Sequence, residues 1–370
     1  LVKEGATLLG NPPQKSPSLV NYPQCDQEIK TLVQELWGGS KWPAGLSERP
    51  FGKGRVYWGS ACATLDPSLY PDYDVAAQIL KAMGVAQDFS ATGPVRYGHR
   101  HTQEREIYFV ANRTPEAVQA ACTFRAGQGQ PELWDPLTGD RKVMARFERH
   151  DGLTTIPMSF DSYQSYFVVF NASANALQSK QAGPNFPDKT PLLALNGPWQ
   201  VSFNKAMGGP ETVDLDSLID WTTHHERGIK YYSGIATYQK AFDLPAGTDL
   251  TRDLYLDLGA VKNLARVLLN DEEMGVVWTA PWQVKISGAV KAKGNRLQIS
   301  VANLWLNRLI GDREKADADV RTVRWDSGML EGKEYKTGRY TFTTYTGRKL
   351  GTELMPSGLL GPVVLRQEKN

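Results

Sequence analysis

The chain has 370 residues, and its 42 lysines and arginines nearly balance its 40 aspartates and glutamates, so the formal net charge is +2. A near-neutral chain lacks the clustered basic surface that dominates nucleic-acid affinity, so we expect no nucleic-acid partner. No apolar run approaches the ~18 residues of a membrane span. Three widely spaced cysteines, Cys25, Cys62 and Cys122, form neither a disulfide framework nor a CxxC metal knuckle. The length predicts two or three domains, each with its own core.

Residues 1–90 alternate between strand-like and helix-like segments. The predicted elements are the last turn of a helix at Leu1–Gly5, a buried strand at Ala6–Leu9, a helix at Cys25–Trp37, a strand at Gly54–Gly59 and a helix at Tyr73–Met83. This alternation indicates a parallel sheet that is covered on both faces. We interpret the segment as a partial α/β domain, either flavodoxin-like or the remnant of a barrel, and we expect its missing strands upstream of Leu1.

Residues 91–175 have the two-residue period of strands, and a small antiparallel β module is predicted there. Its predicted strands are Ile107–Asn112, Val118–Phe124, Pro131–Trp134, Lys142–Phe147 and Tyr166–Phe170. A polar segment rich in alanine, serine and proline follows, and we interpret residues 176–190 as a linker.

Residues 191–370 are predicted to be all-β. The predicted strands are Trp199–Phe203, Ala236–Phe242, Asp253–Leu258, Ala265–Leu269, Arg296–Val301, Arg339–Thr343 and Pro362–Arg366. Strands of this number and spacing indicate a β-sandwich or jelly roll. The expected chain is therefore multidomain, α/β followed by all-β.

Two imidazoles flank an arginine in the stretch VRYGHRHTQEREIYF. On a strand, His99 and His101 share one face and Arg100 lies on the other. Such a pair can bind a metal or a substrate anion, but no third ligand is identifiable, and an exposed edge strand often carries these residue types. No GxSxG, GxxxxGK[ST] or HExxH motif is present.

The loop WTAPW, Trp278–Trp282, follows a strand and a turn. Aromatic side chains at one end of a β-sandwich can stack on a sugar ring, and they can equally close the end of the core. Glycoside hydrolysis requires two carboxyl groups across a cleft. The 40 acidic residues cannot be paired from the sequence, so we assign no catalytic residue on this chain.

Several stretches in order resemble a known family. In the second half they are Tyr231–Pro245, Leu254–Ile286, Ile299–Asp312 and Ser357–Leu365, and in the first half Ser16–Trp37, Gly52–Gly59, Gly98–Arg113 and Gln130–Gly139. Together they resemble the galactose-binding-like jelly-roll domain of family 2 glycoside hydrolases and, more closely, the C-terminal part of family 106 α-L-rhamnosidases. The resemblance covers nearly the whole chain.

This resemblance implies a parent enzyme that hydrolyses α-L-rhamnosides of plant glycosides or pectic glycans with inversion. Its acid and base would lie on a (β/α)8 barrel upstream of Leu1, and calcium would be a cofactor of the parent. It also implies a bacterial parent that is periplasmic or extracellular. In this interpretation the chain is an accessory region whose partners are the upstream catalytic domain and a rhamnose-containing carbohydrate. His99, Arg100 and His101 are the candidate substrate-binding residues.

Two other interpretations stay open. In one, the jelly roll is a carbohydrate-binding module that works alone, with Trp278 and Trp282 stacking on sugar and Asn270 or Asp271 hydrogen-bonding to hydroxyl groups. In the other, the jelly roll is a structural buttress for neighbouring domains. A large exposed apolar surface would favour the buttress, because monomers rarely expose such patches.

Overall fold

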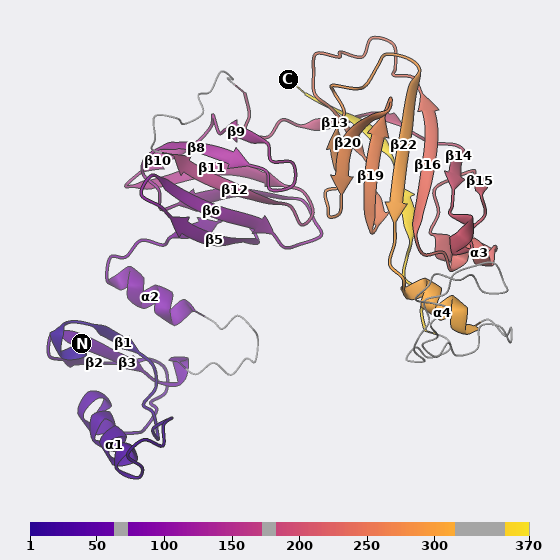
Figure 1. Ribbon diagram of the computed structural model, residues 1–370. Helices are drawn as coiled ribbons and strands as arrows, with labels where there is room; N and C mark the ends of the chain where they lie inside the picture. Colours follow the sequence, from indigo (N-terminus) through magenta and orange to yellow (C-terminus); the bar gives the residue numbers. More distant parts are fainter. Residues whose placement is uncertain (63–72, 172–182, 315–351, 370) are drawn as a thin grey trace. The chain divides into compact units, whose positions relative to one another are not determined.

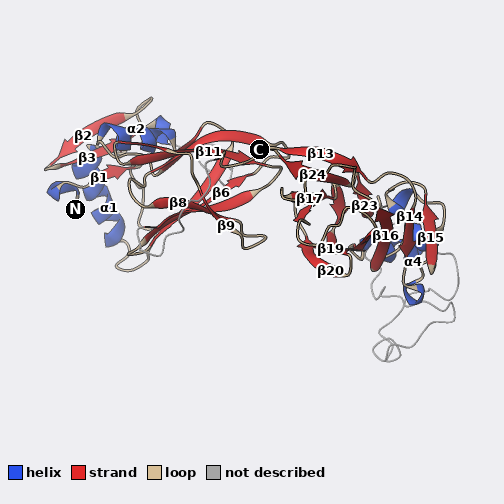
Figure 2. Cartoon of the chain, turned by 90° about the horizontal axis from the view of Figure 1, so that it is seen from above, coloured by secondary structure: helices blue, strands red, loops and turns tan. Residues whose placement is uncertain are grey.

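The computed structural model describes residues 1–62, 73–171, 183–314 and 352–369. It divides into two compact units, Leu1–Asp88 and Phe89–Asn370. Strands predominate among the described residues, and helices are few and short (Figures 1 and 2). The expectation of a β-rich chain is thereby confirmed, and the predicted domain boundaries stay predictions.

The first unit contains a small mixed sheet and two helices. Its elements are η1 (Val2–Glu4), β1 (Thr7–Leu9), α1 (Gln24–Trp37), β2 (Ser47–Phe51), β3 (Gly54–Trp58), η2 (Ser60–Cys62) and α2 (Asp74–Ala82). Strand β1 pairs with β3 in parallel, as the α/β interpretation requires, while β2 pairs with β3 antiparallel. The sequence did not predict β2, because its residues SERPF are mostly polar and include a proline.

We call the next part the central sandwich, residues 89–171. One sheet has the order β10-β11-β7-β4 and the other β5-β6-β12-β8-β9. The bounds are β4 (Phe89–Ala91), β5 (Val95–His101), β6 (Arg105–Asn112), β7 (Val118–Phe124), β8 (Gln130–Trp134), β9 (Arg141–Val143), β10 (Glu148–His150), β11 (Leu153–Phe160) and β12 (Ser165–Asn171). Both sheets contribute to one core, which includes Tyr108, Phe124, Phe160 and Phe170.

Several strands of the central sandwich differ from expectation, and β4, β5 and β10 were not among the five predicted strands. The strand predicted at Lys142–Phe147 is the shorter β9, Arg141–Val143. Strand β11 was not predicted, because threonine, proline and serine separate its apolar residues; in the sheet, alternation buries Ile156, Met158 and Phe160.

We call residues 189–369 the C-terminal sandwich. Its main sheets have the orders β13-β24-β17-β21 and β15-β14-β16-β22-β19-β20, and β18 pairs with β23. The bounds are β13 (Lys189–Ala194), β14 (Trp199–Ser202), β15 (Thr212–Leu215), β16 (Ile235–Phe242), β17 (Leu254–Asp257), β18 (Ala260–Lys262), β19 (Leu264–Leu269), β20 (Glu272–Val277), β21 (Gln283–Lys285), β22 (Asn295–Ala302), β23 (Gly358–Gly361) and β24 (Val364–Glu368), with η3 (Lys205–Met207), η4 (Trp221–Thr223), α3 (Arg227–Lys230) and α4 (Leu306–Glu314). The strand predicted at Arg339–Thr343 lies outside the described residues.

Long-range pairing builds the four-stranded sheet of this sandwich. Strand β24 lies between β13 and β17 and is antiparallel to both (Figure 2). The register places Lys189 opposite Glu368, and Tyr255 opposite Arg366. Residues from the two ends of the sandwich sequence are thus neighbours on one sheet.

A buried hydrogen-bond junction holds one end of the sandwich together. The Tyr238 hydroxyl accepts hydrogen bonds from Trp221 Nε1, at 2.6 Å, and from the backbone N–H of Leu359, at 3.2 Å. All three residues have no solvent exposure. This junction links η4, β16 and β23, which are far apart in the sequence.

Candidate functional site

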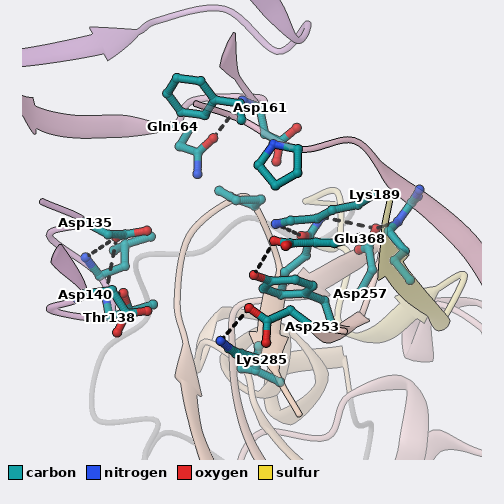
Figure 3. Close-up of a pocket in the computed structure, with 18 of the residues that line it drawn as sticks. Asp135, Thr138, Asp140, Asp161, Gln164, Lys189, Asp253, Asp257, Lys285 and Glu368 are labelled. Atoms are coloured by element: carbon teal, nitrogen blue, oxygen red, sulfur yellow. Dashed lines mark hydrogen bonds and ion pairs between the residues drawn. The ribbon is translucent and has the colours of Figure 1, made fainter. Parts of the chain in front are cut away.

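A cavity with a volume of about 2080 Å³ lies in the unit Phe89–Asn370. One wall is the outer face of sheet β13-β24-β17-β21, and the other comes from the β8–β9 hairpin and the β11–β12 turn of the central sandwich. Figure 3 shows Asp135 and Asp140 on one side, Asp161 at the top, and Lys189, Glu368 and Asp257 on the other side. Pockets for small ligands measure roughly 300–1,000 Å³. This volume therefore fits an extended ligand better than a single small molecule.

Strand alternation gives the sheet its polar outer face. Leu254, Leu256 and Leu365 point inwards and are buried in the core. Their neighbours along the strands must then point outwards. We call the resulting cavity-lining set the polar sheet face; its members are Lys189, Asp253, Tyr255, Asp257, Gln283, Lys285, Arg366 and Glu368.

Opposite charges on the polar sheet face lie next to one another. Arg366 Nε is 2.8 Å from Asp257 Oδ2, and Lys285 Nζ is 2.6 Å from Asp253 Oδ2. Lys189 Nζ is 3.2 Å from Gln283 Oε1. With Glu368, the face carries three cationic and three acidic side chains. It is thus highly polar without a net charge.

A tyrosine lies in the middle of this face. The Tyr255 hydroxyl donates a hydrogen bond to Glu368 Oε1 at 2.9 Å, and Lys189 Nζ lies 3.9 Å from the ring centroid. Burial, reinforced by the Glu368 carboxylate, raises the pKa of Tyr255, so the phenol keeps its proton. Burial lowers the pKa of Lys189, while nearby carboxylates, Asp161 first among them, act in the opposite direction.

The segment before β13 joins the two walls. Asn185 donates from Nδ2 to the carbonyl of Arg146 at 2.6 Å, and its Oδ1 accepts from the N–H of Arg146 at 2.9 Å. Lys142 Nζ donates to the carbonyl of Asn185 at 2.7 Å, and the Phe186 ring lies 5.7 Å from that of Tyr166. These contacts attach the segment to the central sandwich shortly before Lys189 enters the sheet.

The tryptophans predicted to bind sugar both line this cavity. Trp278 is 62% exposed, whereas Trp282 packs partly buried against the core, and its carbonyl accepts from the N–H of Leu258 at 2.8 Å. Trp278 is thus the more accessible of the two tryptophans, and Trp282 contributes to the core. Stacking of either ring on a sugar stays a prediction.

Asn270 and Asp271 lie elsewhere, in the turn between β19 and β20, and do not line the cavity. Both have positive φ, 53° and 71°. Asn270 Nδ2 donates to the carbonyl of Ala289 at 2.8 Å, and Asp271 forms an ion pair with Arg296. These contacts give both residues a role in the turn. Sugar binding by them stays a prediction.

The predicted arrangement on strand β5 is confirmed. His99 and His101 lie on one face, and a single carboxylate holds both: His99 Nε2 is 2.7 Å from Glu106 Oε2, and His101 Nδ1 is 2.7 Å from Glu106 Oε1. The His99 ring also stacks on Tyr108, with centroids 3.9 Å apart. Arg100, on the other face, donates to the carbonyl of His99. The sequence did not single out Glu106, although its place opposite His101 on the neighbouring strand was a usable signal.

Substitutions on β5 separate structural from substrate-binding roles. We expect His99→Ala to lower the free energy of unfolding by about 1–2 kcal/mol, because Glu106 loses a hydrogen-bond partner and Tyr108 loses a stacked ring. Arg100→Ala on the exposed face should change it by less than about 0.5 kcal/mol. Urea denaturation measures both values. If Arg100→Ala also leaves kcat/KM of a longer, active enzyme unchanged, Arg100 does not contact substrate.

The residues that the structure describes bear on the calcium ion that the family resemblance implies. Calcium prefers 6–8 oxygen ligands. Within residues 1–62, 73–171, 183–314 and 352–369, no group of three or more histidine, cysteine, aspartate or glutamate side chains is placed to hold a metal ion. We therefore name no calcium ligands among these residues, and we assign no step to calcium. In the same part of the chain, no helix is long and apolar enough to cross a membrane.

Sequence reasoning missed the polar sheet face. The signal was present in the predicted strand Asp253–Leu258, where Asp253, Tyr255 and Asp257 alternate with leucines. That pattern predicts a polar outer face. It does not predict which strands complete the face.

Residues 1–148 match the model of glycoside hydrolase family 106, described as alpha-L-rhamnosidase. The solved structure of a rhamnosidase from Novosphingobium sp. PP1Y is 33% identical, with a TM-score of 0.70, and the similarity covers 100% of this chain and 31% of that one. A "Putative beta-glucuronidase" from Formosa agariphila is 35% identical over 178 residues, which are 46% of this chain and 15% of that protein. A β-glucuronidase from Ruminococcus gnavus has 19% identity and a TM-score of 0.27 over 32% of this chain and 22% of its own.

The chain therefore spans about a third of the solved rhamnosidase and a smaller share of the curated relative. The match over residues 1–148 and the similarity to the solved rhamnosidase confirm the resemblance to family 106 α-L-rhamnosidases. The resemblance of the second half to the family 2 jelly roll stays a prediction. Residues 1–148 thus match the model of the alpha-L-rhamnosidase family, glycoside hydrolase family 106, and the whole chain is similar in sequence and fold to a solved rhamnosidase.

Proposed function

We propose that this chain is the C-terminal accessory region of a glycoside hydrolase that cleaves α-L-rhamnosides of plant glycosides or pectic glycans. The observation that carries the proposal is the similarity to the Novosphingobium rhamnosidase over the entire chain, at 33% identity. About two thirds of that relative lies outside the similar part. We place the catalytic barrel and its two carboxyl groups in the corresponding upstream part of a longer, secreted or periplasmic polypeptide.

The chemistry of the parent enzyme would be two-carboxylate hydrolysis with inversion. One carboxyl group would protonate the leaving oxygen, and the other would activate a water on the opposite face of the sugar. We assign neither role to a residue of this chain. The C-terminal sandwich, residues 191–370 by the predicted boundary, would be a galactose-binding-like jelly roll; its two facing antiparallel sheets around one core support this assignment.

Rhamnose release tests the proposal. We expect the longer polypeptide to release rhamnose from an aryl α-L-rhamnoside or from rhamnose-containing pectic oligosaccharides, and the 370-residue chain to release none, because its residues would lack the acid and base. Rhamnose release by the short chain would place the catalytic carboxylates among its own residues. No release by the longer polypeptide from any of these substrates would remove the rhamnosidase assignment.

A second candidate function is carbohydrate binding by the C-terminal sandwich itself. It is favoured by the exposed ring of Trp278 at the cavity that the polar sheet face lines. This candidate is compatible with the first, since an accessory region can hold the substrate for a neighbouring catalytic domain.

The buttress interpretation is favoured by a different surface. Ile235 and Leu264, 60% and 38% exposed, both pair with Ala302 and so form one row across β16, β22 and β19. Leu304 and Trp305, which follow β22, are also about half exposed. We propose that the sheet containing β16, β22 and β19 packs against a neighbouring domain, while the polar sheet face binds carbohydrate.

A further inference from the structure

We infer that the polar sheet face and Trp278 bind an uncharged glycan chain, several sugar units long, that runs along strands β13, β24, β17 and β21. This inference rests on the proposed function as part of a glycoside hydrolase and deepens it by naming the class of carbohydrate and its binding surface. The predicted sugar-binding residues Asn270 and Asp271 do not line this cavity.

The first argument is shape. Strands β24, β17 and β21 are hydrogen-bonded side by side, so their outward side chains form a continuous wall. With a volume of about 2080 Å³, the cavity exceeds what one sugar ring needs. The loop Trp278–Trp282 follows β20 directly and lines the same cavity. An elongated ligand can contact the wall and the loop together.

The second argument is hydrogen-bonding capacity. Each sugar hydroxyl both donates and accepts, so it pairs well with a surface on which donors and acceptors alternate. Lys285 and Asp253 offer such a pair, as do Arg366 and Asp257. An ammonium group has three donors and a carboxylate about four acceptor positions. Each pair therefore keeps hydrogen-bonding capacity beyond its own contact, and bonds to charged groups are stronger than neutral ones.

The third argument is charge. Three acidic and three cationic side chains balance on the polar sheet face. The rest of the lining adds five acidic side chains (Asp135, Asp140, Asp161, Glu272 and Glu273) and three cationic ones (Arg141, Lys142 and Lys369), so acidic groups outnumber cationic groups by eight to six. The carboxylate of a uronic acid would lie close to several of these acidic groups. Like charges brought together at an interface cost several kcal/mol. An uncharged glycan avoids this repulsion.

Calorimetric titration of the 370-residue chain tests the inference. The probes are six neutral hexasaccharides (of rhamnose, glucose, galactose, mannose, xylose and arabinose), with hexagalacturonate as the charged comparison. We expect at least one neutral probe to bind with a Kd of ~1 mM or tighter, and little change of that Kd with salt, because no charge pairs with the ligand. Hexagalacturonate should bind more weakly.

Two exposed substitutions locate the site. Trp278→Ala should weaken binding about tenfold by removing the stacking surface, and Lys285→Ala about threefold by removing donors. Lys285 has a half-exposed side chain, so both variants should fold. The matched controls are Trp305→Ala, which removes a tryptophan that is 54% exposed outside the cavity, and Lys293→Ala, which removes an exposed lysine outside it. Neither control should change the Kd.

Three results would overturn the inference: no binding of any neutral probe at ~10 mM, unchanged binding in both cavity variants, or tighter binding of hexagalacturonate than of every neutral probe. Because this experiment measures binding and not hydrolysis, its failure is distinguishable from failure of the rhamnosidase proposal. Rhamnose release by the longer polypeptide without glycan binding by this chain would remove only the binding surface.

Discussion

Gly259→Ala is expected to lower the free energy of unfolding by at least about 3 kcal/mol. Gly259 lies after β17 with φ +68°, and a methyl group there would overlap the backbone carbonyl of Gly361 and lie 2.6 Å from the nitrogen of Pro362. Both obstacles are main-chain atoms, which cannot rotate away as a side chain can. The substitution therefore has to push β17 and the segment before β24 apart.

Gly247→Ala is the matched control, since Gly247 has φ +80° with no atom within 4 Å of the added methyl group. Gly247→Ala introduces the backbone strain of a positive φ without a steric overlap. It should therefore lower the free energy of unfolding by about 1 kcal/mol. Urea denaturation of both variants separates the two effects. Equal losses would show that the close approach of Gly259 and Gly361 does not matter.

The same variant should affect the binding surface. The N–H of Gly259 donates to Asp257 Oδ1 at 2.9 Å, and Asp257 holds Arg366 on the polar sheet face. Displacement of Gly259 therefore shifts both partners of this ion pair. We expect weaker glycan binding from Gly259→Ala than from Gly247→Ala.

Tyr238→Phe is expected to lower the free energy of unfolding by about 2–4 kcal/mol, because two buried donors lose their acceptor. The donors are Trp221 Nε1 and the backbone N–H of Leu359, at 2.6 and 3.2 Å from the hydroxyl oxygen. Tyr163→Phe makes the same chemical change on a side chain that is 53% exposed, and it should cost less than about 0.5 kcal/mol. A loss below about 1 kcal/mol for Tyr238→Phe would mean that the donors find other partners.

The difference in stability between the unsubstituted chain and Tyr238→Phe should also depend on pH. Burial raises the pKa of Tyr238 to about 12, from the value near 10 of an unfolded chain. Between these values the unfolded chain releases the phenolic proton while the folded one keeps it, so stability falls as pH rises. The contribution is complete below pH ~10, and about 2 kcal/mol of it is lost by pH ~12. The stability difference between the unsubstituted chain and Tyr238→Phe should narrow by this amount; a constant difference would contradict the assignment.

The sequence by itself determined those features that arise from neighbouring residues. The i, i+3, i+4, i+7 spacing of Ile29, Leu32, Val33 and Leu36 predicted a helix, observed as α1 from Gln24 to Trp37. Two-residue alternation predicted β6, β7 and β12 almost to their ends. The same alternation placed His99 and His101 on one face of a strand. Each of these predictions depends only on how often side chains return to the same face of a helix or strand.

Ordered sequence stretches also indicated the family, and the match over residues 1–148 confirmed it. The sequence alone could not decide the roles of some single residues. Asn270 and Asp271 are residue types that suit both a sugar site and a turn. Trp278 and Trp282 suit both a binding surface and a core. The alternative roles of these residues share the same local sequence and differ only in what surrounds the side chain in the folded protein. The sequence alone therefore cannot choose between them.

Only the tertiary structure decided which residues form the candidate site. Strand β24 pairs with β13 and β17, and this brings Lys189, Tyr255 and Glu368 together from three distant parts of the chain. Strand order and register depend on packing across the whole sandwich, and a shift by one residue would reverse which side chains face outwards. The polar sheet face is therefore a property of the assembled sheet, whereas its alternating pattern was already present in the sequence.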